Sequence, residues 1–347
     1  MKTSTSTIIA ALLLAAGAAQ AQDAVSVYGS LDIAAYSKQL AGETRTKTLT
    51  SGILNASRWG VRGSEDLGDG LRARFDMSSY IRVDTGEAGR SAADGYWQRY
   101  AWVGLDSAKL GLARLGRIST PNFINTIRFN PYADSSLAPV FMHTYLPSAA
   151  QPMMTSHGTT DSAWSNSIAY NSPSFGGVEF ALQGAASEGT TAGRRVGASG
   201  SYLSKTLSVG VSLEDMKGMA MSFAKPPLVQ PIATDRSAQI GVSYDYTAVK
   251  LYGQYQRTKL ENTGLAVTLA TAQLGASVPI GTGFLLVSGA HTTKDQTALA
   301  DTKRDTWSLG YDHYLSKRTD LYAVVVSDKA TALARGTGLA LGIRHNF

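Results

Sequence analysis

Apolar and polar residues alternate with a period of two along most of this chain. The stretches 71–77, 237–246, 271–278 and 306–312 each place an apolar side chain at every second position, with small or polar residues between. The last residues, 337–347, keep the same alternation up to the end of the chain. Because successive side chains of an extended strand point to opposite faces, the pattern predicts strands with one apolar and one polar face.

The connections between these strands alternate in length, and one of them, 118–163, is much longer than the rest. About sixteen strands fit between them, each near the roughly 9–11 residues with which a tilted strand crosses a bilayer. Short turns on one rim and long loops on the other are typical of outer-membrane barrels. We therefore expect an all-β fold, a transmembrane antiparallel up-and-down β-barrel of about sixteen strands. The short connections are 65–70, 106–109, 172–177, 203–206, 279–283 and 315–319; the longer ones are 38–52, 84–95, 187–193, 217–235, 260–266, 294–304 and 328–336.

The alternation alone leaves two architectures open, because a soluble β-sandwich and a membrane barrel both use two-faced strands. A sandwich buries its apolar faces together, whereas a barrel turns them to lipid and keeps a wet lumen. The rhythm of the connections and the aromatic residues near strand ends favour the barrel. A closed barrel has no unpaired edge, so the last strand should pair with the first, 25–37. The aromatic residues expected in the interfacial girdles are Tyr28, Trp59, Tyr100, Trp102, Tyr170, Tyr244, Tyr246, Tyr255, Tyr311, Tyr314 and Phe347.

The beginning of the chain predicts export. Residues 1–21 combine Lys2, a short apolar core at 8–16 and a small-x-small cleavage site at 19–21, as secretory signal peptides do. We expect the remaining 22–347 to form one outer-membrane barrel domain, since no break in composition indicates a second domain. The chain has no cysteine, so no disulfide stabilises it. Abundant glycine (35 residues) and sparse proline (10) suit short strands joined by turns better than long helices.

Other kinds of chemistry find little support in the sequence. Ser156, His157 and Asp161 lie within one loop, where the members of a hydrolase triad rarely reach the required geometry. The five histidines lack metal-ligand spacing, so we expect no metal, no cofactor and no enzymatic activity. The formal net charge is +6, but the basic residues are scattered, which argues against nucleic acid as a partner. Positive residues in the lumen and loops, or contacts to anionic lipopolysaccharide, explain the charge better.

Seven stretches spread over the chain together resemble the Gram-negative general porins, especially the betaproteobacterial group. The most specific are 57–75 (SRWGVRGSEDLGDGLRARF) and 314–323 (YLSKRTDLYA). The resemblance implies a sixteen-stranded barrel in the outer membrane of a Gram-negative bacterium, a homotrimer, and passive diffusion of small hydrophilic solutes. It also implies that the long third loop folds into the lumen, and that the outer-membrane assembly machinery reads the terminal Phe347. The other stretches are 27–34, 98–105, 115–123, 166–180 and 342–347.

Strand parity predicts which charged residues face the lumen. In 56–63 and 71–77 the apolar side chains take one face, which leaves the charged ones on the other. Parity leaves Arg99 ambiguous, because it shares its face with small and apolar residues. The family resemblance implies lumen-facing arginines at the places of Arg58 and Arg99. The residues that parity assigns to the lumen are Arg58, Arg62, Arg72, Arg74 and Asp76.

The long loop carries few charges. Between 118 and 163 only Arg128, Asp134 and Asp161 are formally charged, and Arg117 lies just before the loop. In the porin family that this chain resembles, members that prefer cations typically place several acids in this loop. With an arginine cluster on the facing wall, the sequence predicts a preference for anions.

These features predict a general diffusion porin, a water-filled channel for small hydrophilic solutes and ions that prefers anions moderately. Asp134 and Asp76 would shape the field across the constriction. Two alternatives stay open: a substrate-specific channel for a dicarboxylate, phosphate or sugar, and a barrel enzyme or adhesin. Any single arginine could equally be a rim residue paired with an acid such as Glu65 or Asp66, with no effect on permeation. The residues predicted to attract anions are Arg58, Arg99, Arg74 and Arg117.

Overall fold

The computed structural model describes residues 25–146, 148–150, 161–187, 193–223, 228–262, 264–297 and 299–347. The expected signal peptide, 1–21, lies outside the described residues, as do Ser156 and His157. The described part contains seventeen strands and two short helices. The strands are β1 (Ser26–Lys38), β2 (Thr46–Ser51), β3 (Arg58–Gly68), β4 (Leu71–Tyr80), β5 (Tyr100–Ser107), β6 (Gly111–Ser119), β7 (Ala163–Asn171), β8 (Val178–Ala185), β9 (Arg195–Leu203), β10 (Leu207–Phe223), β11 (Leu228–Asp245), β12 (Lys250–Asn262), β13 (Leu265–Ile280), β14 (Gly283–Gln296), β15 (Leu299–Tyr314), β16 (Thr319–Ala330) and β17 (Gly336–Asn346).

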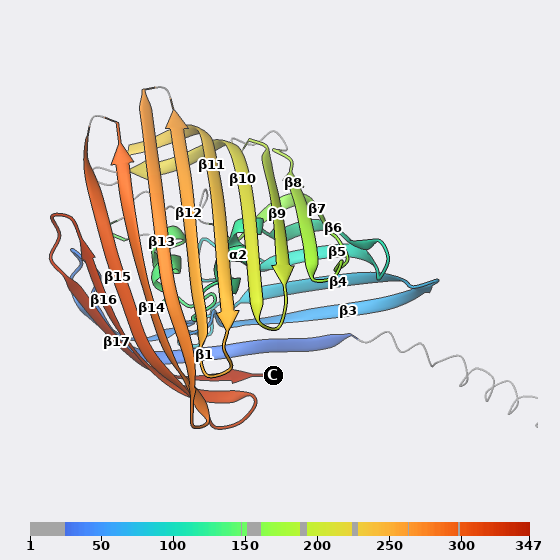
Figure 1. The fold of residues 1–347 in the computed structure, drawn as a ribbon, viewed down its shortest axis with the longest axis horizontal. Helices are drawn as coiled ribbons and strands as arrows, with labels where there is room; N and C mark the ends of the chain where they lie inside the picture. The colour runs from blue at the N-terminus through green and yellow to red at the C-terminus, as the bar shows by residue number, and fades with distance from the viewer. Residues whose placement is uncertain are drawn as a thin grey trace, which may run out of the picture.

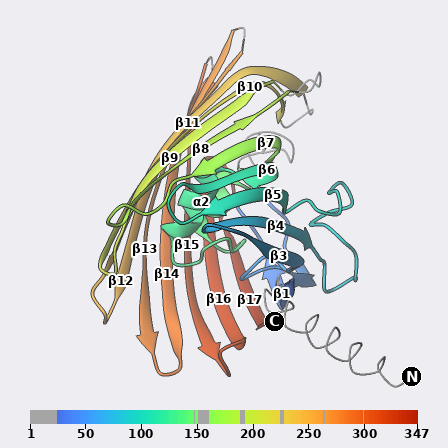
Figure 2. The same cartoon turned by 90° about the vertical axis from the view of Figure 1, so that its right-hand side faces the viewer.

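The strands form one closed antiparallel barrel (Figures 1 and 2). From β3 to β17, each strand hydrogen-bonds to the next one in the chain. Strand β17 then pairs with β1 over eight positions, from Ser30 opposite Asn346 to Ser37 opposite Leu339. The predicted pairing of the last strand with the first is therefore confirmed, and it closes the barrel without a free edge.

The seventeen strands fill sixteen positions in the barrel. One edge of β1 pairs with β17, and the other edge pairs with both β2 and β3. Residues 33–38 of β1 face β2, and residues 26–30 face β3. A bend at residues 52–57 separates β2 from β3, so the two segments together occupy one position. The sixteen-stranded all-β barrel is confirmed, with its second strand split in two.

The alternating pattern places apolar side chains on the outside of the barrel. On β17, Leu339, Leu341 and Ile343 are 44%, 52% and 42% exposed, whereas the inward-facing Ala340 between them is fully buried. A soluble sandwich would bury these large side chains most deeply. Their exposure forms an apolar outer belt, which is the arrangement that lipid requires and a soluble sandwich does not.

The long connection between β6 and β7 folds into the barrel, as predicted (Figure 2). It contains α2 (Pro121–Arg128) and α3 (Pro139–Thr144). Helix α2 begins after Thr120, whose hydroxyl accepts from the backbone N–H of Phe123 at 3.2 Å. Helix α2 contacts β8 to β11, and α3 contacts β13 to β15. No helix in the described ranges is long and apolar enough to cross a membrane.

A small apolar core joins this loop to the inner wall of the barrel. Leu137 and Met142 of the loop pack in one buried cluster with Tyr322 and Val324 of β16 and with Ala340 of β17. These wall residues point into the barrel, so the loop shields them from the water in the lumen. The loop therefore occupies one side of the lumen and narrows the passage.

Candidate pore constriction

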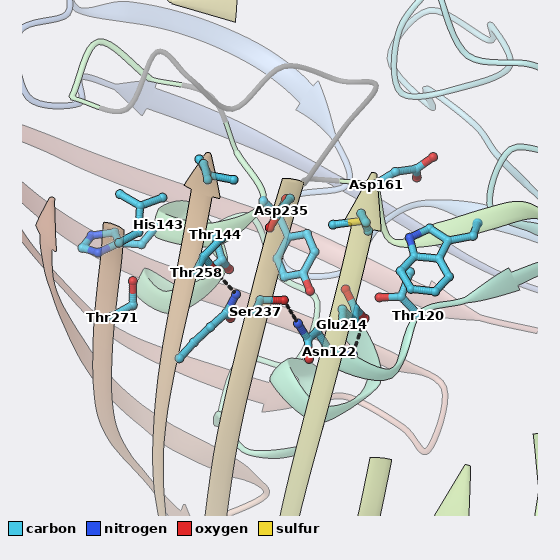
Figure 3. A pocket seen from close by; sticks show the side chains of 16 residues that line it. Thr120, Asn122, His143, Thr144, Asp161, Glu214, Asp235, Ser237, Thr258 and Thr271 are labelled. Atoms are coloured by element: carbon cyan, nitrogen blue, oxygen red, sulfur yellow. Dashed lines mark hydrogen bonds between the residues drawn. The ribbon is translucent and has the colours of Figure 1, made fainter. Parts of the chain in front are cut away.

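Polar side chains hold α2 against the barrel wall. Asn125 donates to Gln239 at 3.1 Å, and Gln239 donates to Thr126 at 2.8 Å. Glu214 accepts from the backbone N–H of Asn122 at 2.8 Å (Figure 3). All five residues are buried, so these hydrogen bonds replace those that water would make to both surfaces.

A histidine and an ion pair hold α3. Each ring nitrogen of His143 lies 2.7 Å from a threonine hydroxyl, that of Thr292 on one side and of Thr306 on the other. Burial lowers the pKa of His143 well below its usual 6.5, so the ring is neutral at neutral pH. Beside it, Arg304 pairs with Asp328 at 2.9 Å, and both side chains are buried. Buried polar contacts thus fix both helices of the loop.

Asp32 shapes the bend at 52–57, which leads into β3. Its carboxylate accepts from the backbone N–H groups of residues 53, 54 and 55 at 3.0, 3.1 and 3.0 Å. It also accepts from the hydroxyl of Tyr322 at 2.7 Å. Asp32 is fully buried, and these four donors take the place of water around its charge. The bend that they hold brings Arg58 to the first position of β3.

Arg58 and Arg99 meet Asp134 of the long loop beside this bend, and we call these three residues the constriction cluster. Asn55 links them, because its amide donates to Asp134 Oδ1 at 3.0 Å while its side-chain oxygen accepts from Arg58. Arg99 Nη2 lies 3.9 Å from Asp134 Oδ2. The Arg99 guanidinium lies over the ring of Tyr100, 4.7 Å from its centroid. The fold thereby joins three charged residues that are far apart in the sequence.

The constriction cluster carries two positive charges and one negative charge. The 3.9 Å separation between Arg99 and Asp134 is longer than the N–O distance of a tight, bidentate pair, which is roughly 2.7–2.9 Å. Apart from Asp134, the described part of the long loop contributes only Arg128 and Asp161 as formal charges. Low-dielectric walls focus the field of such a cluster into the passage, so the electrostatic potential that passing ions meet there is positive.

A second set of charged residues lies nearer the rim formed by the short turns. Arg62 stands opposite Asp76 across the β3–β4 ladder. Arg74 pairs with Asp106 at 2.7 Å, and Arg72 stands opposite the same acid in the β4–β5 ladder. Residues directly opposite in an antiparallel ladder share a face, so the parity assignment of these side chains agrees with the register. Each of these arginines has an acidic neighbour.

Arg117 and Arg128 have partners of their own. Arg117 Nε donates to the carbonyl of Gln98, which directly precedes Arg99, at 2.6 Å. A bulge follows Gly116, which has a φ of +133°, and it disrupts the ladder at Arg117. Arg117 Nη2 donates to both carboxylate oxygens of Asp161, at 2.8 Å each. Arg128 ends α2 and donates to Ser201 of β9 at 3.3 Å. Arg117 therefore lies beside the constriction cluster with its charge paired to Asp161, whereas Arg128 contacts the wall at β9.

Stacking on aromatic rings recurs among the arginines of this wall. Besides the pair already described, three more guanidinium groups lie over rings: Arg62 over Tyr28 at 5.0 Å, Arg90 over Tyr80 at 4.8 Å and Arg114 over Trp102 at 5.3 Å. Such stacking holds a guanidinium in place while leaving its edge free for an anion. Arg90 was not predicted to be a site residue, because it falls in a stretch expected to be a loop. Tyr28, Tyr100 and Trp102 were expected in the interfacial girdles, and that expectation is wrong: they lie against these arginines, and Tyr28 also hydrogen-bonds to Asp76.

A cavity of about 520 Å³ adjoins the constriction cluster. Its lining includes Asp134 together with Lys38, Arg82 and Arg90, which come from the ends of strands and loops at the long-loop rim. Arg90 pairs with Asp94 at 2.8 Å. Lys38 likewise pairs with Glu43 at 3.6 Å and Arg82 with Glu87 at 2.9 Å, so each basic side chain of this lining has an acidic partner.

The last residue of the chain takes part in closing the barrel. The backbone N–H of Phe347 donates to the carbonyl of Gly29 at 3.1 Å, and the N–H of Gly29 donates back at 3.0 Å. The Phe347 ring lies so close to Gly29 that a Cβ at this position would come within 2.4 Å of it. The terminal aromatic residue therefore extends the ladder and packs where only a glycine fits.

A closed barrel with an apolar outer belt and a polar lumen is built to cross an outer membrane. Sixteen tilted strands enclose more space than their side chains fill, so an aqueous passage remains. An inward-folded loop narrows that passage next to fixed charges. These features define a membrane channel whose selectivity is set at its constriction.

The chain belongs to the Gram-negative porin family, whose family model matches residues 6–333. It is 34% identical over 373 aligned residues to outer membrane porin protein 32 of Delftia acidovorans, with 99% of each chain covered. The anion-selective porin from Comamonas acidovorans has a similar structure, with a TM-score of 0.78 and 27% identity over 94% of this chain and 100% of that one. A trimer form of OmpT from Vibrio cholerae shares the fold, with a TM-score of 0.70 and 14% identity over 93% and 99% of the two chains. The porin family and the outer-membrane location predicted from the sequence are confirmed.

Proposed function

We propose that this porin is a general diffusion channel with a moderate preference for anions. The observation that carries the proposal is the convergence of Arg58 and Arg99 on a single acid, Asp134. The similarity to an anion-selective porin of Comamonas acidovorans supports the same preference. The remaining arginines predicted for the wall have acidic partners or neighbours and add less to the net field.

Permeation through such a channel needs no catalytic step. Small hydrophilic solutes diffuse through water, and the focused positive potential raises the local concentration of anions and lowers that of cations. A guanidinium presents a planar fork that matches carboxylate and phosphate groups, so the constriction should admit small organic anions as well as chloride. Asp134 offsets part of the potential, which keeps the preference moderate.

We further propose a homotrimer, in line with the trimer form of the Vibrio cholerae structure that shares this fold. The signal-peptide pattern supports cleavage after residue 21, leaving 22–347 as the mature barrel. The exposed position of Phe347 at the closing ladder supports its recognition by the outer-membrane assembly machinery. The apolar outer belt would contact membrane lipid and lipopolysaccharide.

Replacing Arg58 and Arg99 with serine tests the proposed selectivity. We expect the chloride-to-potassium permeability ratio of R58S/R99S to fall about two- to fivefold, because the cations nearest the narrowing are removed. The ratio follows from the zero-current potential of purified protein in a planar bilayer with a potassium chloride gradient. Saturable block by one dicarboxylate, phosphate or sugar would instead indicate a substrate-specific channel.

The matched control removes two positive charges far from the constriction cluster. Lys317 and Arg318 are exposed in the short turn between β15 and β16. The K317S/R318S variant should keep the wild-type ratio. An unchanged ratio in R58S/R99S, or an equal fall in the control, would contradict the role assigned to Arg58 and Arg99.

A further inference from the structure

A small cavity lies between the long loop and the part of the barrel wall formed by β10 to β13 (Figure 3). Its volume is about 30 Å³, and a single water molecule needs roughly 10–15 Å³ of such space. The cavity therefore has room for one ion and a water molecule. Among the polar residues of its lining, those at least nine-tenths buried include Asn122 of α2, Glu214 of β10, Asp235 and Ser237 of β11, and Gln256 and Thr258 of β12.

Two of these residues are acids without a basic partner. Asp235 is fully buried, and neither of its carboxylate oxygens has a hydrogen-bond partner among the described residues. Its neighbours across the two ladders are Met216 and Leu260, whose side chains offer no donor. Glu214 accepts from the backbone N–H of Asn122 at 2.8 Å. Within the described ranges neither acid forms an ion pair. Two buried carboxylates in this setting are costly unless a cation or protons neutralise them.

Two neutral side chains bring further unpaired oxygens to the same cavity. The amide nitrogen of Asn122 donates to Ser237, and that of Gln256 donates to Thr258 at 3.1 Å. These contacts leave Asn122 Oδ1 and Gln256 Oε1 buried, without a hydrogen-bond partner in the part of the chain that the structure describes. Buried oxygens of this kind normally accept a hydrogen bond. They are independent of the two acids, and they too suit an electropositive ligand.

The chemistry of these ligands selects a hard cation. Carboxylate, amide and hydroxyl oxygens suit calcium, magnesium and manganese better than the softer transition metals. Among the described residues, no group of three or more histidine or acidic side chains could hold a metal, so amide oxygens have to complete any site here. Calcium accepts roughly six to eight oxygens in irregular geometry, whereas magnesium demands a nearly octahedral shell and retains several waters. Two carboxylates also match the charge of one divalent ion.

We propose that this cavity binds one calcium ion through Glu214, Asp235 and the amide oxygens of Asn122 and Gln256. Asn122 belongs to the long loop and the other three residues to the wall, so the ion joins α2 to β10, β11 and β12. This inference departs from the expectation, drawn from the sequence, that the protein binds no metal. It goes beyond the proposed function, because it concerns the docking of the loop and not the charge of the constriction cluster.

Calcium titration of the purified protein tests the site. Protein in detergent, freed of lipopolysaccharide and stripped with EDTA, is titrated with calcium chloride, and bound ions are counted by native mass spectrometry. We expect one ion per chain in the wild type. Asp235→Asn keeps the size of the side chain but removes a charged ligand, so the calcium affinity should fall at least about tenfold. Should D235N not fold, Gln256→Met removes one neutral ligand and should weaken binding by about threefold.

The matched control is Asp215→Asn, which removes the acid next to Glu214 on β10. Asp215 points to the opposite face of the strand and lies 3.7 Å from Lys217, so D215N should bind calcium as the wild type does. No bound ion in the wild type, equal affinity of D235N and the wild type, or an equal fall in D215N would overturn the proposal. These experiments measure ion binding and not permeation, so their failure would leave the proposed anion preference standing.

Discussion

At the residue scale, the constriction cluster is held in place by its neighbours. Asn55 bonds to both Arg58 and Asp134, and Arg99 stacks on Tyr100. Exposed ion pairs on a flexible rim contribute little, because their side chains move and water screens them. Fixed guanidinium groups beside a low-dielectric wall keep their field directed into the passage. The positions of these two arginines, rather than the net charge of the chain, are the basis for the expected selectivity.

Removing the acid of the cluster should strengthen the preference for anions. Asp134→Asn keeps the size of the side chain and its contact with Asn55 but removes the negative charge. We expect the chloride-to-potassium permeability ratio to rise about twofold. The zero-current potential in a salt gradient measures it. The control Asp69→Asn, which removes an exposed acid from the short turn between β3 and β4, should keep the wild-type ratio. A lower ratio in D134N than in the wild type would be incompatible with this account.

At the element scale, the long loop is a separate structural unit docked inside a rigid barrel. Helix α2 is fixed by amide and hydroxyl groups, and α3 by His143 and the buried pair of Arg304 with Asp328. Such contacts are favourable only while every partner is in place, since unpaired buried polar groups are costly. The width of the passage therefore depends on the docking of this loop.

Docking of α3 should weaken in acid. The pKa of His143 is well below 6.5 when docked, because of burial and the nearby charges of Arg304 and His291, and it returns to about 6.5 when exposed. Between these values the undocked loop binds more protons, so docking is strongest above pH 6.5 and weakens as the pH falls below it. Amide exchange in α3, corrected for intrinsic rates, should show up to about tenfold less protection at pH 5.5 than at pH 7.5.

The control for this pH effect is His143→Asn, which cannot titrate in this range. Its α3 protection should be lower at both pH values but should not change between them. Equal pH dependence in the wild type and in H143N would assign the effect to other groups.

At the scale of the whole molecule, the outside meets lipid and the inside meets water. These two solvents make opposite demands on alternate residues, so the period-two pattern was sufficient to predict the barrel, its faces and the pairing of 337–347 with the first strand. Register follows from the same pattern, because a slip by one residue would turn apolar side chains into the lumen. The register also places Arg62 opposite Asp76, and Arg74 on the same face as its partner Asp106, while the lumen-facing role of these arginines and of Arg58 stays a prediction.

Where the backbone departs from a regular strand, the alternation of residues no longer predicts which way a side chain points. The bend at 52–57 depends on the distant Asp32, so β2 was read as part of a loop. Arg99 precedes the first residue of β5, and Arg117 lies in a bulge, so parity applies to neither. Arg90 belongs to a loop that folds back over Tyr80, a contact that no local pattern encodes.

The most direct measurement of the central claim is the zero-current potential of the wild-type protein in a planar bilayer with a potassium chloride gradient. The constriction cluster predicts that chloride permeates more readily than potassium, by a modest factor that falls as ionic strength rises and screens the field. A potential of the opposite sign, showing that potassium permeates more readily, would contradict the account.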